Sequence, residues 1–179
     1  MTPMVFFKPA LFALLAANAV IYATTGRASE GMDALAWFAL LVLFEIETRF
    51  PRWTRGTRTA TALDLLRFSA AVAIAVAAFA FVRESQWLDA INAWLWIGVV
   101  AVLELEIRLQ SRVTRHRRLI AAVSILLYGT LVMVALTWLA QGAWFNAYDA
   151  ALWIAAFILI EMDLLRQIRA TPITAPGNM

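Results

Sequence analysis

Six long runs of apolar residues constrain this chain more than any other feature of its sequence. Each run has about 20 residues, the length at which a helix rising 1.5 Å per residue crosses a ~30 Å hydrocarbon core. Strand-like alternation is absent from these runs, and lipid accepts only helices or closed barrels, so helices are expected. The chain is also 63% hydrophobic and only 15% charged, whereas soluble domains carry about 25% charged residues. We therefore predict an all-α integral membrane protein. The six expected segments are 5–24, 32–50, 64–83, 87–110, 118–140 and 144–167.

One motif occurs three times, on alternate segments. An Asp or Asn is followed by Trp four residues later, then by Glu eight residues after that, and then by a second acid. The copies are Asp33, Trp37, Glu45 and Glu47; Asn92, Trp96, Glu104 and Glu106; and Asp149, Trp153, Glu161 and Asp163. The glutamates recur at intervals of 59 and 57 residues, the length of one helical hairpin with its loop.

The spacing predicts one transmembrane bundle built from three repeated hairpins. The bundle covers residues 1–170, and its hairpins cover about 5–50, 64–110 and 118–167. Residues 171–179 contain two prolines and a glycine, and a flexible tail is expected there.

Arginines predict the orientation of the bundle. Ten of them lie in or beside the two connections after the second and fourth segments, whereas the opposite connections hold only Arg27 and Arg83, which are offset by acids. The positive-inside rule then places both termini in the cytoplasm. Fourteen arginines against the single Lys8, in a chain rich in alanine, indicate a bacterial source, so the expected location is the inner membrane. Anionic lipid headgroups are expected partners of the arginine-rich connections.

The acids of the motif permit three interpretations. Only 11 residues, about 17 Å of helix, separate the Asp or Asn from the Glu, so at least one polar end lies at membrane depth. Glu45, Glu104 and Glu161, with the second acids after them, could form a cytoplasmic vestibule that attracts cations or exchanges protons. Alternatively, an acid of each copy pairs with an arginine near the lipid headgroups, as the i,i+4 spacing of Glu45 and Arg49 and the i,i+3 spacing of Asp163 and Arg166 allow. A third interpretation is that the acids form a surface that binds a partner protein.

The remaining polar and aromatic residues inside the segments are expected to support packing. Trp37, Trp96 and Trp153 are predicted to pack in the core or at interfaces, with Asp33, Asn92 and Asp149 as possible partners of their indole N–H groups. Asn18 is the only strongly polar residue inside the first segment and is expected to hydrogen-bond across helices.

Two function classes follow from these patterns. One is a transporter or channel for a cation, a proton or a small solute, with the carboxylates as gate or coupling residues. The other is a non-catalytic accessory, assembly or regulatory subunit of a larger membrane complex, or a homo-oligomer. The chain has no cysteine and one histidine, and it has no Walker motif or nucleophile elbow, so enzymatic activity and a cofactor are not expected, and the spacing of the acids selects no metal. Its basic residues lie between the hydrophobic segments, where topology explains them, so nucleic-acid binding is not expected.

Overall fold

The computed structural model describes the backbone of residues 4–50, 57–108 and 110–170, and side chains within residues 8–47, 49–50, 58–105 and 118–159. Over these residues the chain is all-helical, as the sequence predicts. The six helices are α1 (Met4–Thr25), α2 (Ala28–Arg49), α4 (Thr57–Arg83), α5 (Trp87–Arg108), α6 (Gln110–Ala140) and α7 (Trp144–Ala170).

Four helices are long and apolar enough to cross a membrane within the described residues. They contain the stretches Lys8–Thr25, Arg58–Arg83, Trp87–Leu105 and Arg118–Ala140. The apolar part of α7 is shorter, Trp144–Leu159. Helix α2 has 22 residues, but its four acids lower its hydropathy. These features are those of a membrane protein.

Two helices begin earlier than their apolar runs. Helix α4 starts at Thr57 and α6 at Gln110, seven and eight residues before the segments expected at 64 and 118. A polar segment can continue a helix wherever water or a headgroup can contact its side chains, so the end of an apolar run need not end the helix. The hydrophobic runs thus locate these helices but not their first turns.

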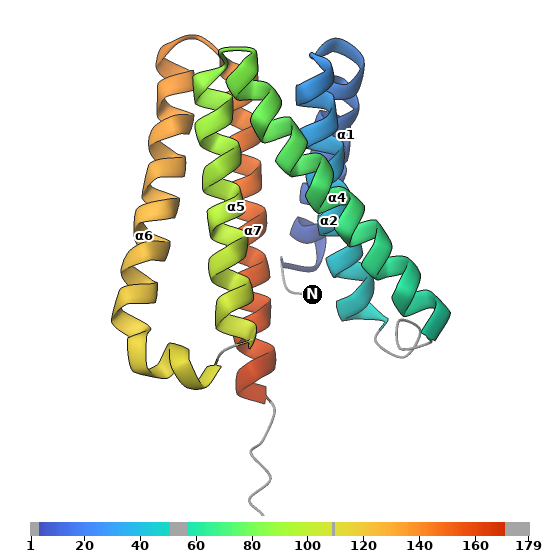
Figure 1. The fold of residues 1–179 in the computed structure, drawn as a ribbon, viewed down its shortest axis with the longest axis vertical. Coiled ribbons are helices and arrows are strands. Elements are labelled where there is room, and N and C mark those ends of the chain that lie inside the picture. The colour runs from blue at the N-terminus through green and yellow to red at the C-terminus, as the bar shows by residue number, and fades with distance from the viewer. Residues whose placement is uncertain (1–3, 51–56, 109, 171–179) are drawn as a thin grey trace, which may run out of the picture.

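The helices close into a ring. Among the described residues each helix packs against the next one in chain order, and α7 packs against α1. No such contact is found between α2, α5 and α7 over the same residues. The centre of the ring therefore holds side chains and the cavities between them. Figure 1 shows α4 crossing obliquely in front of α2, with α5 and α6 upright beside it.

Three short turns lie at the same end of the bundle, which we call the turn end (Figure 1). The α4–α5 turn places Ser85 at φ 57°, and the α6–α7 turn places Gly142 at φ 79°. In the first, Gln86 N–H donates to Phe81 O at 2.9 Å; in the second, Ala143 N–H donates to Trp138 O at 2.9 Å. This is the left-handed helix C-cap that glycine suits best. The two turns have the same geometry although their residues differ.

The α1–α2 turn is held by a side chain instead. The Glu30 carboxylate accepts the Arg27 backbone N–H at 2.8 Å. This contact caps the N-terminus of α2, as the glutamate of a capping box does, and so stabilises the turn between α1 and α2. It also fixes Glu30 at the turn end, close to the centre of the ring.

Candidate functional site

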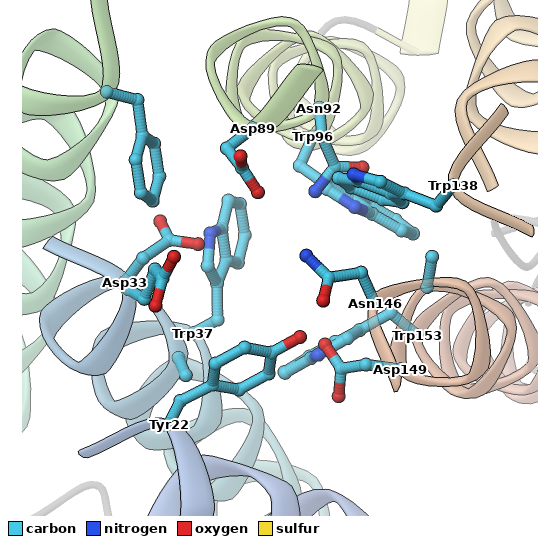
Figure 2. A pocket seen from close by; sticks show the side chains of 14 residues that line it. Tyr22, Asp33, Trp37, Asp89, Asn92, Trp96, Trp138, Asn146, Asp149 and Trp153 are labelled. Carbon is cyan, nitrogen blue, oxygen red and sulfur yellow. The ribbon is translucent and has the colours of Figure 1, made fainter. Parts of the chain in front are cut away.

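The three Asp and Asn residues that begin the repeated motif line one cavity. Asp33 from α2, Asn92 from α5 and Asp149 from α7 converge near the turn end, around a space of about 60 Å³. Figure 2 shows their side chains pointing into this space from separate helices. From the sequence we predicted that these residues support the glutamates. In the structure they line a cavity of their own, which we call the polar cavity.

A second set of polar residues lines the same cavity one turn nearer the turn end. These residues are Glu30, Asp89 and Asn146, and they recur at the same intervals of 59 and 57 residues. Tyr22 of α1 completes the polar lining. The cavity thus has four carboxylates, and no Lys or Arg is found among the described residues that line it. A lining with this charge favours a cationic occupant.

Some polar groups of the cavity have partners. Asn18 Nδ2 donates to Asp149 Oδ1 at 2.7 Å, from α1 to α7. This confirms the expected bond of Asn18 across helices. It also links the first helix of the ring to the last.

Other polar groups are buried without partners in the described part of the chain. Asp33 Oδ1, Asn92 Oδ1 and Trp37 Nε1 have no hydrogen bond. The Trp37 indole interacts with the Asp33 carboxylate, but its Nε1 forms no hydrogen bond of normal geometry in the described part of the chain. Leaving a buried polar atom unpaired costs about 1–3 kcal/mol. Unpaired acceptors that face a cavity are available to a ligand.

Four aromatic side chains close the inner side of the polar cavity, and we call them the tryptophan cluster: Trp37, Trp96, Trp153 and Phe157. All four are buried. The ring centroids of Trp37 lie 6.4 Å from those of Trp96 and Trp153, and Trp96 lies 4.6 Å from Phe157. Packing in the core is thus confirmed for the three tryptophans. Because α2, α5 and α7 do not touch through their backbones, these large side chains fill the centre of the ring.

A second cavity lies on the other side of the tryptophan cluster. It measures about 310 Å³ and is lined mainly by apolar side chains of α2, α5 and α7, with Ala71 of α4. Its charged lining residues are Arg67 and Glu104. Trp37 and Trp153 line both cavities. The cluster therefore separates the polar cavity from this apolar cavity.

The glutamates that the sequence predicted as a vestibule are described only in part, and those that are described have different surroundings. Glu45 pairs with Lys8 at 2.7 Å and lies 4.0 Å from Arg49, and Glu47 pairs with Arg67. Glu104 lines the apolar cavity instead. The side chains of Glu106, Glu161 and Asp163 lie outside the described residues. The pairs of Glu45 and Glu47 fit the border interpretation of these acids.

Several cavity residues were missed by the sequence reasoning. Tyr22 and Trp138 come from α1 and α6, whose sequences do not repeat, so no periodic signal marks them. Glu30, Asp89 and Asn146 did carry a signal, because they precede the motif by three residues in every copy. Residues three and four apart share a helix face. That relation could have placed them beside Asp33, Asn92 and Asp149.

Comparisons with protein-family models, with curated proteins and with solved structures give no match to this chain.

Proposed function

We propose that this protein is a six-span membrane transporter or channel that takes up a cation at its polar cavity. The observation that carries the proposal is the lining of that cavity. Four carboxylates surround it, no basic side chain is found among its described lining residues, and Asp33 Oδ1 is buried without a partner. Ionisable groups within a membrane-spanning bundle normally mark the path of an ion or a proton.

The proposed orientation places the polar cavity on the outer side of a bacterial inner membrane. The distribution of arginines supports cytoplasmic termini, and the three turns at the turn end would then face the outer solution. Helices α2 and α7 complete the six spans in this proposal, in three repeated hairpins. The ring arrangement supports the insertion of α2 into the membrane, because the α2 acids that line the polar cavity face the centre of the bundle and not the lipid.

In the proposed path, a cation binds in the polar cavity, passes the tryptophan cluster and leaves through the apolar cavity. Glu104 lies on the wall of that second cavity and offers the next carboxylate. Passage requires Trp37 and Trp153 to move apart, since both line the two cavities. Alternating exposure of a site between repeated units is the common mechanism of secondary transporters.

A second function, that of an accessory subunit, draws support from the opposite end of the bundle. There Glu45 and Glu47 are held in ion pairs with Lys8 and Arg67. Such pairs suit a stable border between protein and headgroups. Purification in mild detergent distinguishes the two, because a subunit would copurify with a stoichiometric partner and a transporter need not.

The test is cation flux into proteoliposomes that contain the full chain. We expect the Asp33→Asn/Asp89→Asn variant to lose at least about tenfold in rate, because neutralising one end of the path removes the attraction for the ion. The Glu45→Gln/Glu104→Gln/Glu161→Gln variant measures the contribution of the other end. Glu84→Gln is the matched control, since Glu84 is an exposed acid at the turn end outside the polar cavity, and glutamine can still accept the hydrogen bond from the Ser29 hydroxyl. Parent protein without flux above empty liposomes would refute the transport proposal.

A further inference from the structure

We propose that the cation held in the polar cavity is a small protonated amine, with Asp33 as its charge partner and Trp37 as its aromatic wall. This inference rests on the proposed cation uptake and adds the chemical class of the ligand. It comes from three properties of the cavity: how its acids are spaced, which of them are already engaged, and what surrounds them.

The acids of the polar cavity are not arranged as a metal site. Among the residues with described side chains, no group of three or more His, Cys, Asp or Glu is placed to hold a metal ion. Calcium takes six to eight oxygen ligands, and magnesium demands near-octahedral geometry. A lining that combines scattered carboxylates with amides and indoles does not meet either demand.

Two of the four carboxylates are engaged, which leaves Asp33 and Asp89, and of these only Asp33 has an oxygen that is buried without a partner in the described residues. Asp149 accepts a hydrogen bond from Asn18, and Glu30 accepts one from the Arg27 backbone. Asp33 Oδ1 has no donor in the described residues and is buried. An ammonium group carries up to three N–H donors and a full positive charge. It therefore satisfies the unpaired oxygen and neutralises the carboxylate in one contact.

Aromatic side chains make up much of the lining of the cavity that Asp33 enters. Trp37, Trp96, Trp138, Trp153 and Tyr22 all line the polar cavity, and Figure 2 shows the Trp37 indole between Asp33 and the side chains of α5 and α7. Ring faces attract organic cations, and aromatic cages are the usual binding sites of substituted ammonium groups. An alkylammonium ion is stabilised both by the Asp33 carboxylate and by the Trp37 ring. A metal ion is strongly hydrated and would have to exchange its water ligands for contacts with indole rings.

The size of the cavity limits the amine. A space of about 60 Å³ holds a few water molecules, at roughly 10–15 Å³ each on this measure. Methylammonium has two heavy atoms and fits within that space. Longer amines could place only their ammonium end there.

The experiment measures binding of radiolabelled methylammonium to the purified full-length protein in detergent by scintillation proximity. Sodium, potassium, magnesium and unlabelled ethylammonium serve as competitors at equal ionic strength. We expect ethylammonium to displace the label at a concentration at least about tenfold lower than any of the metal ions. This measurement needs no variant and is therefore independent of folding defects.

Variants then assign the site. Asp33→Asn should weaken methylammonium binding at least about tenfold, because the amide oxygen can still accept a hydrogen bond but the negative charge that balances the ammonium is lost. Trp37→Leu should weaken it about tenfold and Trp37→Phe only about threefold, since phenylalanine keeps a ring face. Glu84→Gln, at the turn end but outside the polar cavity, should bind as the parent does.

The outcomes separate this inference from the function on which it rests. Equal or better displacement by a metal ion would overturn the amine assignment and leave cation uptake standing. Absence of binding by every cation would overturn both. Unchanged affinity in Asp33→Asn, with the variant monodisperse in detergent, would remove Asp33 from the site.

Discussion

At the scale of single residues, the most unusual group in this protein is the Asp33 carboxylate. Its Oδ1 atom is buried and unpaired in the described part of the chain, and other carboxylates line the same cavity. Groups that reduce stability without a structural benefit are commonly found at functional sites. The proposed cation supplies the missing partner.

Replacing Asp33 with Asn should therefore stabilise the empty protein while weakening cation binding. Removing an unpaired charge without changing the side-chain shape should add about 1 kcal/mol to the free energy of unfolding, which raises Tm by roughly 2–4 °C in a chain of this length. Thermal unfolding in detergent, without added cation, measures this. Glu84→Gln is the control and should change Tm little, because the glutamine oxygen can still accept the hydrogen bond that Glu84 accepts from the Ser29 hydroxyl. A lower Tm for Asp33→Asn would show that the carboxylate is satisfied in the folded state.

The sequence indicated which residues matter better than it indicated where they meet. Four residues turn an α-helix by 400°, so each step of the motif drifts by about 40°. Trp37 stays close to the line of Asp33, but Glu45, three such steps away, is turned by about 120°. Glu45 thus leaves the centre of the ring and meets Lys8 of α1. Residues four apart therefore lie on nearly the same face of a helix, but residues twelve apart do not.

At the scale of helices and turns, two features hold the ring in its order. One is the pair of left-handed turns at Ser85 and Gly142, and the other is the bond from Asn18 to Asp149. Neither follows from hydropathy. Apolar runs predicted six helices, but lipid provides no hydrophobic force between helices, so packing and polar contacts decide which helices become neighbours.

Ser85 should be a site where glycine stabilises the fold. A residue with a Cβ at φ 57° costs roughly 1–2 kcal/mol, of which glycine's backbone entropy offsets part. Ser85→Gly is therefore expected to add about 0.5–1 kcal/mol to the free energy of unfolding. Gly142→Ala, at φ 79°, should have the opposite sign and a similar or larger magnitude. Unfolding curves of both variants in the same detergent test this, and a change of the same sign in both would refute it.

Asn18 should stabilise the contact that closes the ring. Asn18→Ala removes the 2.7 Å bond from α1 to α7 and leaves Asp149 with one partner fewer, for an expected loss of about 1–3 kcal/mol. The measurement is the Tm of the purified variant. Thr24→Ala is the control, because the Thr24 hydroxyl bonds only within its own helix. Equal effects of both substitutions would mean that the bond across helices contributes nothing specific.

At the scale of the whole molecule, the bundle encloses two cavities, which the tryptophan cluster separates. The tryptophan cluster was predictable in part, since three tryptophans at matching positions were expected in the core. The cavities were not, because they depend on how far apart α2, α5 and α7 stand. That spacing follows from ring closure by Tyr22 and Asn18 of α1 and by α6, whose sequences show no repeat.

Removing a side chain from the tryptophan cluster should make the protein leak cations. Trp37→Ala removes the side chain that contacts Trp96, Trp153 and Phe157 and joins the two cavities that it separates. We expect faster passive cation flux in proteoliposomes, together with a loss of about 3–5 kcal/mol in stability. Trp87→Ala controls for tryptophan loss, because Trp87 is 61% exposed. An unchanged leak in folded Trp37→Ala protein would show that the barrier lies elsewhere.

The central claim is that the polar cavity admits cations from the outer solution, and the absence of cysteine from this chain makes it directly measurable. Asn92→Cys, in the polar cavity, and Gln141→Cys, on the exposed turn, are each treated from the outer side with a positively and a negatively charged methanethiosulfonate. Four lining carboxylates should favour the cationic reagent at Asn92→Cys by about tenfold or more relative to the same ratio at Gln141→Cys. Equal ratios at the two positions, or an Asn92→Cys thiol that reacts only from the cytoplasmic side, would contradict the account.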